Sequence, residues 1–402
     1  MAKRHILFVT QVLPYPLDAG AKVRAYYMLR HLAQRHCVTV ASLVRETDSA
    51  NAVSHLAEFC EAVHTAPMRR SFVRDAASLL LGLAARQPAL IVRDRSRRFR
   101  NLLCHVVGES RFDAVHVDQI KTAQHVAGIA RLPRLIDMHN VYHEMIAGMA
   151  KLTVLSWRRR LLEREARTMA RYEREACRSF DEILAVTATD AGRLKEMVGD
   201  ERRVTAIPIC VDPAGTPLIP LNDTSHGLLC VGAMFYPPNV DGAIWFLREI
   251  LPCVRREAPD AQLRIVGPRP DRAIVRAATA DSHILVMGYV EDLTPHFAAS
   301  AALVVPLRAG SGMRVKILDA MARGIPVVST SLGAEGISAR NGEDILLADS
   351  ANQFAQATVH LLRDVELRRR LAQNARRLIE THYNWRRRYG EVDAVYERLL
   401  ER

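Results

Sequence analysis

The chain has 402 residues, of which 49% are hydrophobic and 25% charged. This length exceeds that of one typical domain and predicts two domains of about 200 residues each. Because the sequence has no uninterrupted run of about 18 apolar residues, it excludes the composition of a transmembrane helix.

Positive charge is the unusual feature of the composition. The formal net charge is +12, and arginines recur in clusters at residues 69–70, 93–100, 158–160, 368–370 and 386–388. Such clusters suit nucleic acid, an anionic membrane surface or phosphorylated substrates. We expect no nucleic-acid partner, because the sequence carries no helix-turn-helix, zinc-finger or RNP-type motif. Two interpretations stay open: solvated helix faces without a partner, and peripheral contact with an anionic membrane surface.

The cysteines and the first residues indicate the compartment. The seven cysteines are scattered without a CxxC pair, which favours reduced thiols and argues against a disulfide framework or a metal site. Residues 1–10 carry only a short apolar run without a small-residue cleavage site, so they are predicted to form a strand and not a signal peptide. We expect a cytoplasmic protein, with the inner face of the membrane as a place of peripheral contact.

The first half of the chain alternates apolar runs with helical patterns. The run at residues 5–10 (HILFVT) is apolar almost throughout, as expected for a parallel strand buried on both faces. Residues 49–109 are predicted to be mostly helical, because they are rich in Ala, Leu and Arg. Further strands are predicted at 38–44, 113–118, 134–138, 182–187 and 204–208, and helices at 21–35, 188–198 and 157–180, the last capped by Ser156.

A linker and a second alternation follow. Residues 213–222 hold three prolines and a glycine without a periodic pattern, which is typical of a linker. The two halves predict an α/β fold with two doubly wound parallel sheets and a ligand cleft between the domains. The second half has predicted strands at 227–232, 261–267, 283–288, 302–307 and 325–330, and predicted helices at 239–257, 291–300, 351–363, 366–381 and 385–400.

Residues 307–330 (LRAGSGMRVKILDAMARGIPVVST) form the most informative stretch. The turn at 310–312 feeds a predicted helix, whose first backbone N–H groups and positive dipole end favour an anion. Arg314 and Lys316 add positive charge, and Asp319 lies on the same helical face as Lys316. This pattern suits a diphosphate next to a hydroxyl-bearing sugar. The alternative is a surface pair of Lys316 and Asp319, worth roughly 0.2–0.5 kcal/mol.

Two features of the first half also lie at the carboxyl ends of strands, where open α/β sheets bind ligands. The loop at 11–20, which ends in Gly20, follows the first strand, but it is not a GxGxxG fingerprint and supports no dinucleotide. His139 follows the strand at 134–138 and opens a polar cluster. It could donate to a carbonyl or a sugar hydroxyl; the alternative is a loop histidine hydrogen-bonded to the backbone.

Residues 310–329 (GSGMRVKILDAMARGIPVVS) resemble the C-terminal signature of the GT-B-fold glycosyltransferases of family 4 (glycosyl transferases group 1), in their bacterial polysaccharide-biosynthesis type. Segments at 8–32, 231–246, 262–267 and 286–307 match as well, and the likeness is strongest over 227–347.

The resemblance implies the GT-B architecture, two Rossmann-like domains that face a central cleft. Residues 1–208 would form the acceptor-binding domain, 209–225 the linker and 226–383 the nucleotide-sugar-binding domain. Residues 384–402 would form a helix that crosses back to the first domain.

The resemblance also assigns roles to individual residues. Asp319 takes the place of the acidic residue that binds the nucleotide ribose, and residues 312–316 occupy the loop that faces the diphosphate and the sugar. Gly20 matches a glycine beside donor and acceptor, and His139 matches a histidine that faces the transferred sugar. The residues expected to bind the donor are Gly20, Gly310, Ser311, Gly312, Met313, Asp319 and Glu335.

Two departures from the family pattern concern the donor site. Ser311 stands where the family has a glutamate eight positions before the second acid, so Glu335 or Glu144 would have to supply that contact. The family's Arg and Lys after the first strand of the second domain are also replaced, within residues 233–241.

Because cationic groups stabilise a departing diphosphate, we expect Arg314 and Lys316 to substitute for the replaced pair. With His139 they would form the catalytic set of a retaining, hexosyltransferase-like enzyme that needs neither metal nor cofactor. The donor would be a nucleotide-diphospho-sugar and the acceptor a glycan or lipid-linked hydroxyl. A catalytically reduced protein that binds a nucleotide-sugar or a partner enzyme as a scaffold is the alternative, and an epimerase or phosphorylase shares the architecture.

Overall fold

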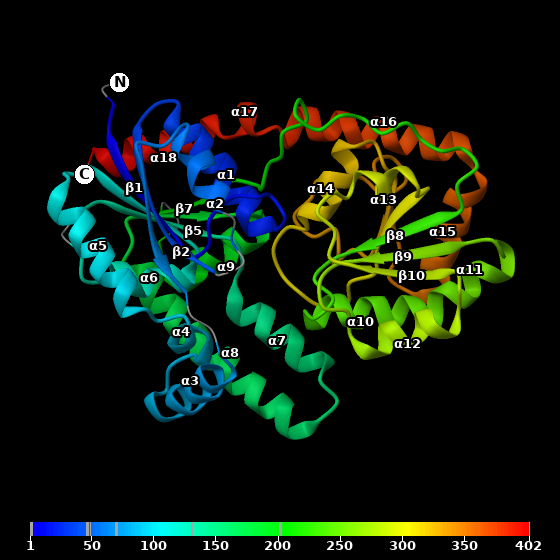
Figure 1. Ribbon diagram of the computed structural model, residues 1–402, viewed down its shortest axis with the longest axis horizontal. Helices are drawn as coiled ribbons and strands as arrows, with labels where there is room; N and C mark the ends of the chain where they lie inside the picture. Colours follow the sequence, from blue (N-terminus) through cyan, green and yellow to red (C-terminus); the bar gives the residue numbers. More distant parts are fainter. Residues whose placement is uncertain are drawn as a thin grey trace. The chain divides into compact units, whose positions relative to one another are not determined.

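The computed structural model describes residues 3–45, 48, 50–68, 71–129, 132–200 and 203–401. The chain divides into two units (Figure 1). Unit 1 comprises Met1–Cys210 and Arg388–Arg402, and unit 2 comprises Val211–Arg387. Of the arginine clusters, residues 69–70 lie outside the described part of the chain.

The sheet of unit 1 has seven strands, all parallel, in the order β3-β2-β1-β4-β5-β6-β7. Its central strands are almost entirely buried, which explains their continuous apolar sequences. The strands are β1 His5–Thr10, β2 Cys37–Val44, β3 Ala62–Pro67, β4 Ala114–Asp118, β5 Arg134–Met138, β6 Glu182–Ala185 and β7 Val204–Ala206.

Helices connect these strands and cover the sheet (Figure 1). The long helix α8 begins at Ser156 itself, with Leu155 as the capping residue, so the predicted cap is displaced by one position. The helices of unit 1 are α1 Gly20–Ala33, α2 Ala50–Ala57, α3 Phe72–Ala85, α4 Ala89–Arg93, α5 Arg97–Glu109, α6 Ile120–Val126, α7 Tyr142–Leu152, α8 Ser156–Arg178, α9 Ala188–Val198 and α18 Gly390–Leu400.

The sheet of unit 2 has six parallel strands in the order β10-β9-β8-β11-β12-β13. The strands are β8 Gly227–Val231, β9 Gln262–Val266, β10 Ile284–Gly288, β11 Ala302–Val305, β12 Val327–Ser329 and β13 Leu346–Leu347. The helices are α10 Pro237–Trp245, the π-helix η2 Phe246–Ile250, α11 Leu251–Glu257, α12 Arg272–Ala280, α13 Thr294–Ala298, α14 Val315–Ala322, α15 Ala351–Arg363, α16 Val365–His382 and α17 Trp385–Arg388.

Each unit has its own hydrophobic core. In unit 1 the core includes Leu7, Ile136 and Met169, and in unit 2 it includes Leu228 and Phe354. Among the described residues, no helix combines the length and apolarity needed to cross a bilayer.

The segment Arg388–Arg402 follows unit 2 in the chain but belongs to unit 1. Two tyrosines of this segment are almost fully buried there. Tyr389 forms hydrogen bonds with Arg24 and with the backbone N–H of Cys210, and the Tyr396 hydroxyl lies 2.8 Å from His116 Nδ1. Helix α18 is therefore packed against unit 1 through one buried face.

The predicted fold class, two doubly wound parallel sheets, is confirmed. In both sheets the strand order reverses beside the first strand, between β1 and β4 and between β8 and β11, and such switch points are where doubly wound sheets bind ligands. Residues 49–109 hold the strand β3, which the prediction of a mostly helical segment missed. The reason is that β3 is a half-exposed edge strand without a continuous apolar run.

Candidate active site

The loop between β11 and α14 holds the predicted glycine-rich turn. Gly310 and Gly312 have φ angles of 128° and 76°, which residues with a Cβ rarely adopt. A Cβ on Gly310 would also come within 2.6 Å of Arg314 Nη2. Met313 is buried, and α14 begins directly after Arg314. The turn therefore leads the backbone into the amino terminus of α14, where unpaired N–H groups favour an anion.

Lys316 extends from the first turn of α14 to the carboxyl end of β8. Its Nζ donates to the Val231 carbonyl at 2.5 Å and to Asn239 Oδ1 at 3.1 Å. The backbone makes room for this ammonium group, because a Cβ on Gly232 would stand 3.0 Å from Nζ. A Cβ on Gly267 would in turn collide with the Gly232 carbonyl. Two glycines after β8 and β9 thus keep side chains away from the sheet edge beside the cation.

Burial governs the ionisation of Lys316. It lowers the pKa of Lys316 to about 8, and the positive charge of Arg314 acts in the same direction. The ammonium group is therefore charged at pH 7 but loses its proton more readily than that of an exposed lysine. An anion bound here would stabilise the charged form and raise this pKa. The arrangement suits a phosphate group.

Asp319, one turn further along α14, pairs with Arg323. Arg323 Nε donates to Asp319 Oδ1 at 3.0 Å, and among the described residues Arg323 is its only side-chain partner. Burial raises the pKa of the Asp319 carboxyl, while Arg323 acts against that shift. Lys316 and Asp319 have different partners, so the alternative of a Lys316–Asp319 surface pair is wrong.

The side chains of Arg314 and Ser311 differ in their hydrogen bonding to the protein. The Arg314 guanidinium turns back onto its own loop, where Nη1 donates to the carbonyls of Ser311 and Gly312. It therefore braces the turn in this structure. Ser311 is 6% exposed, and its Oγ has no hydrogen-bond partner among the described residues. A buried hydroxyl without a partner is costly and indicates a place where a ligand could complete the hydrogen bond.

Glu335 lies on the neighbouring loop, which follows β12. This loop is tied to the loop after β11, because Thr330 Oγ1 donates to the Leu307 carbonyl at 2.5 Å and accepts from the Gly333 N–H at 2.9 Å. In the part of the chain that the structure describes, the Glu335 carboxylate forms no hydrogen bond or ion pair. Glu144, the other proposed replacement for the missing glutamate, is exposed on α7 of unit 1.

In unit 1, Gly20 is the first residue of α1 and His139 the first residue after β5. The His139 side chain is buried, with Nε2 2.9 Å from Asp118 Oδ1 and 3.9 Å from Asp137 Oδ2. Thr10 Oγ1 donates to the other oxygen of Asp118 at 2.8 Å. Within the described residues neither ring nitrogen is hydrogen-bonded to the backbone, so the alternative of a backbone-bound loop histidine is wrong.

A buried ion pair stands next to His139. Arg24, which is fully buried on α1, donates from Nε to Asp137 Oδ2 at 2.9 Å and from Nη2 to Oδ1 at 3.2 Å. Its Nη1 donates to the Pro208 carbonyl at 2.7 Å and to the Tyr389 hydroxyl at 3.2 Å. Burial alone would raise the pKa of Asp137, but Arg24 and the nearby histidines hold this pKa below its ordinary value.

Asp118, Asp137 and His139 also offer three oxygen and nitrogen atoms within 4.8 Å of one another, a spacing that could hold a metal ion. Both Asp137 oxygens already accept hydrogen bonds from Arg24, so one carboxylate of this group is neutralised by a buried cation. Asp118, Asp137 and Arg24 were not among the site residues predicted from the sequence. A signal was present, because β4 (AVHVD) and β5 (RLIDM) both carry a buried aspartate at or next to their ends.

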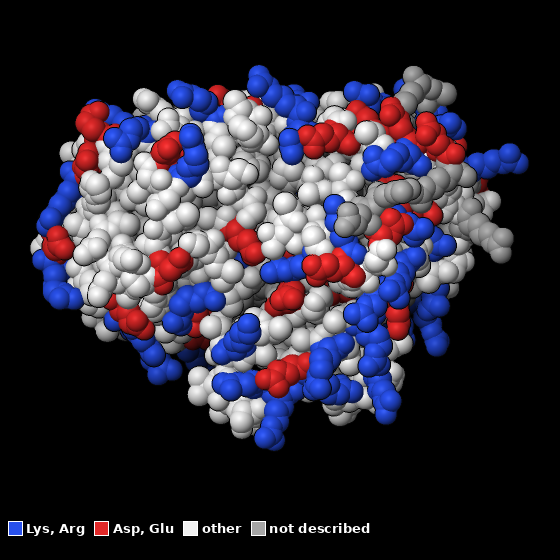
Figure 2. All heavy atoms as spheres, turned by 180° about the vertical axis from the view of Figure 1, so that it is seen from behind, with Lys and Arg blue, Asp and Glu red and all other residues white. Residues whose placement is uncertain are grey.

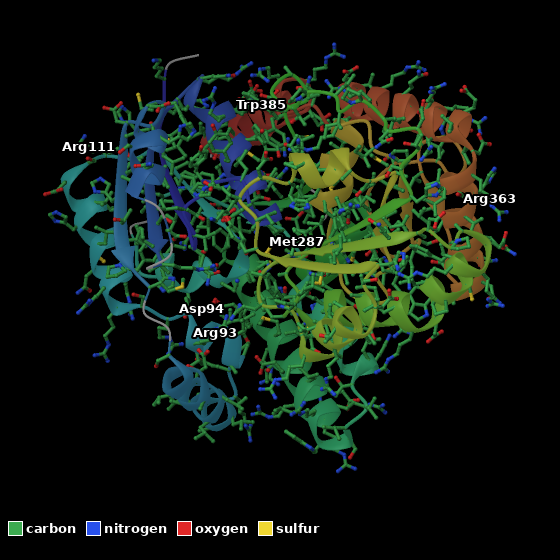
Figure 3. The ribbon with its side chains drawn as sticks, turned by 45° about the vertical axis from the view of Figure 1, so that its right-hand side comes forward. Arg93, Asp94, Arg111, Met287, Arg363 and Trp385 are labelled. Atoms are coloured by element: carbon green, nitrogen blue, oxygen red, sulfur yellow. The ribbon has the colours of Figure 1, made fainter. Side chains whose placement is uncertain are left out.

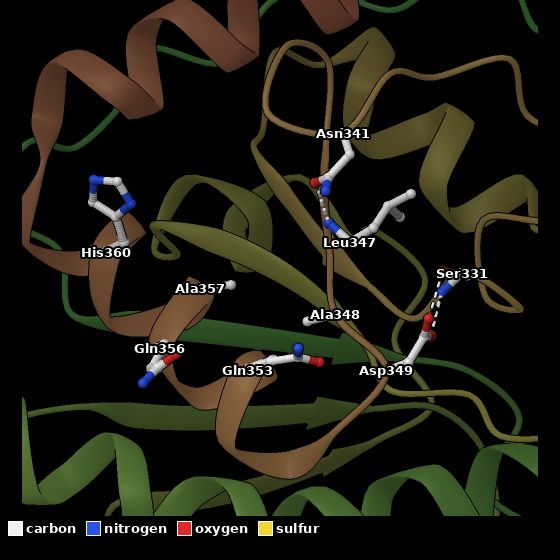
Figure 4. Close-up of a pocket in the computed structure, with 9 residues that line it drawn as sticks. All are labelled: Ser331, Asn341, Leu347, Ala348, Asp349, Gln353, Gln356, Ala357 and His360. Atoms are coloured by element: carbon white, nitrogen blue, oxygen red, sulfur yellow. Dashed lines mark hydrogen bonds between the residues drawn. The ribbon is translucent and has the colours of Figure 1, made fainter.

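A separate surface pocket of unit 2 lies around β13 and α15 (Figure 4). There Asp349 accepts hydrogen bonds from the N–H and the hydroxyl of Ser331, and Asn341 Oδ1 accepts from the Leu347 N–H at 2.8 Å. None of the predicted site residues lines this pocket. We assign no ligand to it.

Comparison with known proteins defines the class. The description "Glycosyltransferase Family 4" matches residues 19–214, and "Glycosyl transferases group 1" matches residues 225–364. The two matched segments fall in the two doubly wound sheets, and the architecture is that of the GT-B glycosyltransferases. The chain belongs to the glycosyltransferases of family 4, group 1.

Curated relatives and solved structures agree with this placement. An "Uncharacterized 44.6 kDa protein in cps region" of Klebsiella pneumoniae is 28% identical over 172 residues, 41% of this chain and 44% of the relative. A phosphatidyl-myo-inositol mannosyltransferase of Mycobacterium leprae is 32% identical over 157 residues, 38% of this chain and 41% of the relative. The chain thus spans less than half the length of the curated relatives it matches.

Two solved structures share the fold. HepE of Anabaena in complex with UDP has a TM-score of 0.68 at 13% identity, over 98% of this chain and 100% of that chain. Sucrose-phosphate synthase of Thermosynechococcus elongatus has a TM-score of 0.72 at 16% identity, over 99% of this chain and 100% of that chain.

Proposed function

We propose that the protein is a retaining glycosyltransferase that moves a sugar from a nucleotide-diphospho-sugar to a hydroxyl of a glycan or lipid-linked acceptor. The observation that carries this proposal is the half-buried Lys316 ammonium group beside the amino terminus of α14 and the glycine turn. Such a cation is suited to a diphosphate leaving group. The structures of HepE with UDP and with UDP-glucose, both of similar fold, support a nucleotide-sugar as the donor.

The donor roles divide among the residues of unit 2. The diphosphate would contact the backbone of residues 310–313 and Lys316, and Arg314 would hold the turn in shape. Asp319 would accept hydrogen bonds from the ribose hydroxyls. Ser311 and Glu335, whose side chains lack partners among the described residues, would bind sugar hydroxyls in place of the family's glutamate.

The acceptor roles fall to unit 1, to which we assign residues 1–208 and the returning segment 384–402, with 226–383 as the donor domain. His139 would orient the transferred sugar, with Asp118 fixing the ring and Gly20 leaving space beside it. The acceptor oxygen would form its bond to the anomeric carbon on the face from which the diphosphate leaves, which retains the configuration. The bond from that carbon to the diphosphate oxygen would break, and the acceptor proton would pass to the departing diphosphate.

We further propose that the reaction needs no metal ion, since Lys316 and the helix dipole already supply positive charge to the diphosphate. After dialysis against EDTA, the rate of nucleotide diphosphate release should stay within about twofold of the untreated rate. Added Mg²⁺ or Mn²⁺ should leave it unchanged. A loss on chelation that Mn²⁺ restores would instead assign the Asp118, Asp137 and His139 cluster a metal.

A donor screen tests the central proposal. Purified protein is titrated with UDP-, GDP-, ADP- and dTDP-sugars, and one of them should bind and be slowly hydrolysed. Asp319→Ala should weaken its binding about 10- to 100-fold, because a charge-assisted hydrogen bond contributes roughly 1.5–3 kcal/mol. The matched control is Asp260→Ala, which removes an exposed acid of the same unit and should bind normally.

The screen also separates the alternatives. Proton NMR of the hydrolysis product should show the donor's anomeric configuration in the first sugar released. Binding without turnover would favour the scaffold, which the replacement of the family's glutamate by Ser311 would explain. Folded protein that binds none of the four nucleotides would overturn the donor site.

We also propose that the acceptor is met at an anionic membrane surface on the cytoplasmic side. Arginine and lysine side chains gather in the lower right part of the face seen in Figure 2, and the net charge of +12 favours an anionic surface. All seven cysteines are free thiols, as expected in a reducing compartment.

A further inference from the structure

Helix α3 turns its apolar stripe toward solvent. Its exposed residues follow the helical spacing of three and four, and they include Val73 at 75% exposure, Leu80 at 67% and Leu81 at 59%. Ala76, Ala77 and Ala84 continue the same face. An amphipathic helix of a globular protein normally buries this stripe. The opposite orientation therefore indicates an unoccupied contact surface.

The packing of α3 fixes this orientation. Its buried face carries the small residues Ser78 and Gly82. A Cβ on Gly82 would come within 2.9 Å of the Gln87 carbonyl, so the helix approaches its neighbour too closely for any larger residue. On the same side, Arg164 of α8 donates to the Leu83 carbonyl at 2.9 Å. Because the small residues face α4, the apolar stripe on the opposite side points outward.

A second exposed apolar group belongs to the turn between α7 and α8. Val154 is 90% exposed, Trp157 is 60% exposed, and Leu155 lies between them with about half its surface exposed. These residues precede and begin α8, the helix whose Arg164 donates a hydrogen bond to α3. In Figure 1 α3 and the turn between α7 and α8 both lie at the lower side of unit 1.

Arginines accompany the apolar residues. Arg158, Arg159 and Arg160 are exposed on the first turn of α8, and the Arg158 guanidinium lies 5.1 Å from the Trp157 ring centroid. In the described structure none of these three arginines forms an ion pair with a carboxylate. Arg93 near α3 is different, because Asp94 neutralises it at 2.9 Å (Figure 3). The three arginines of α8 thus add positive charge that no carboxylate of the described structure balances.

We propose that α3 and the α7–α8 turn dock on an anionic lipid bilayer. The apolar stripe and Trp157 would enter the interface between headgroups and acyl chains, and the three arginines would contact anionic headgroups. The positive charge of this surface favours an anionic bilayer over a second copy of the chain as the binding partner. Pairing of two copies through this surface would bring like-charged arginine clusters together, whereas an anionic bilayer complements them. The inference rests on the proposed membrane-linked acceptor, for which it identifies the docking surface.

Co-sedimentation with vesicles tests the inference without any sugar donor. The full chain should bind vesicles of phosphatidylcholine with phosphatidylglycerol and bind pure phosphatidylcholine far more weakly, and added salt should weaken the binding. Leu80→Asp with Leu81→Asp should reduce binding at least about tenfold. Replacement of Arg158, Arg159 and Arg160 by alanine should reduce it about 100-fold on anionic vesicles only.

The matched control is Val275→Asp, which places the same charge on an exposed apolar position of α12 in unit 2 and should bind like wild type. Circular dichroism confirms that each variant is folded. Equal binding by all variants, or equal binding to both vesicle types, would overturn the proposal. So would a dimer in light scattering that Leu80→Asp dissociates, since the occupant would then be a second copy.

The donor screen and the vesicle assay test separate claims, so a negative result in one does not decide the other. Loss of vesicle binding with intact donor hydrolysis would refute only the docking surface. Vesicle binding without any nucleotide-sugar binding would refute only the transferase.

Discussion

Replacement of Lys316 by methionine should lower kcat/KM for the nucleotide-sugar by about 100- to 1,000-fold. Removal of one preorganised group that stabilises developing charge costs roughly 2.7–4 kcal/mol in comparable sites. Lys316 is half-buried beside the glycine turn and has only the Val231 carbonyl and Asn239 as partners in the described structure. Methionine keeps the length and apolar stem of the side chain, so the loss would report the charge.

The same residue predicts a pH dependence. Because burial lowers the pKa of Lys316 to about 8, the free protein loses this positive charge as the pH rises through that value. kcat/KM, which reports groups of the free protein, should therefore fall above about pH 8. A bound diphosphate favours the charged lysine, so kcat should hold to higher pH.

Steady-state rates of nucleotide diphosphate release from pH 6 to 10 check both results. The control is Arg276→Met, which removes an exposed cation of α12 and should leave the profile unchanged. The proposed role of Lys316 would be ruled out if Lys316→Met had the wild-type rate and its kcat/KM fell above pH 8 as in the wild type.

Replacement of Arg24 by methionine should lower the free energy of unfolding by about 3–5 kcal/mol. Loss of one partner from a buried ion pair leaves the other charge unpaired in a medium of low dielectric constant. Here the stranded group would be Asp137, which is fully buried, and the Tyr389 hydroxyl would lose a donor as well. A decrease of the melting temperature by roughly 6–20 °C follows for a unit of this size.

The pH dependence of this effect can be worked out from Asp137. In the wild type its pKa is held below the ordinary value, so its stabilising contribution is present above the unfolded pKa and is lost as the pH falls through the folded pKa. In Arg24→Met burial would raise that pKa, and a neutral Asp137 costs less to bury. The destabilisation should therefore be largest near neutral pH and shrink toward pH 4.

Urea unfolding followed by circular dichroism measures these differences. Arg111→Met, which removes an exposed arginine of the same unit (Figure 3), should stay within about 0.5 kcal/mol of wild type. The double variant Arg24→Met with Asp137→Leu should recover part of the loss, because no buried charge remains. Equal stability of Arg24→Met and Arg111→Met would show that the ion pair does not support the fold.

The sequence was sufficient for the fold class because buried parallel strands leave continuous apolar runs. The strands that escaped prediction, β3 and β13, are a half-exposed edge strand and a two-residue strand, and neither leaves such a run. The glycine turn, Lys316 and Asp319 could be recognised because they occupy one short contiguous motif. Their partners could not be foreseen in the same way, since Asn239 is 77 positions from Lys316.

The buried ion pair of unit 1 was even harder to predict from the sequence. Arg24 and Asp137 are 113 positions apart, and the Arg24–Tyr389 hydrogen bond spans 365 positions. An arginine on an otherwise ordinary helix and an aspartate in a buried strand carry no mark of their pairing. Only the sheet order, which sets β1 and its helix beside β4 and β5, brings them together.

The return of Arg388–Arg402 to unit 1 has a consequence for synthesis on the ribosome. Unit 2 is one uninterrupted stretch of chain, so every residue it needs has been translated before Tyr389 appears. Unit 1 cannot be completed until Tyr389 and Tyr396 have been translated. Until then Arg24 and His116 lack their tyrosine hydrogen-bond partners. The half of the protein that is translated first is therefore the half that is completed last.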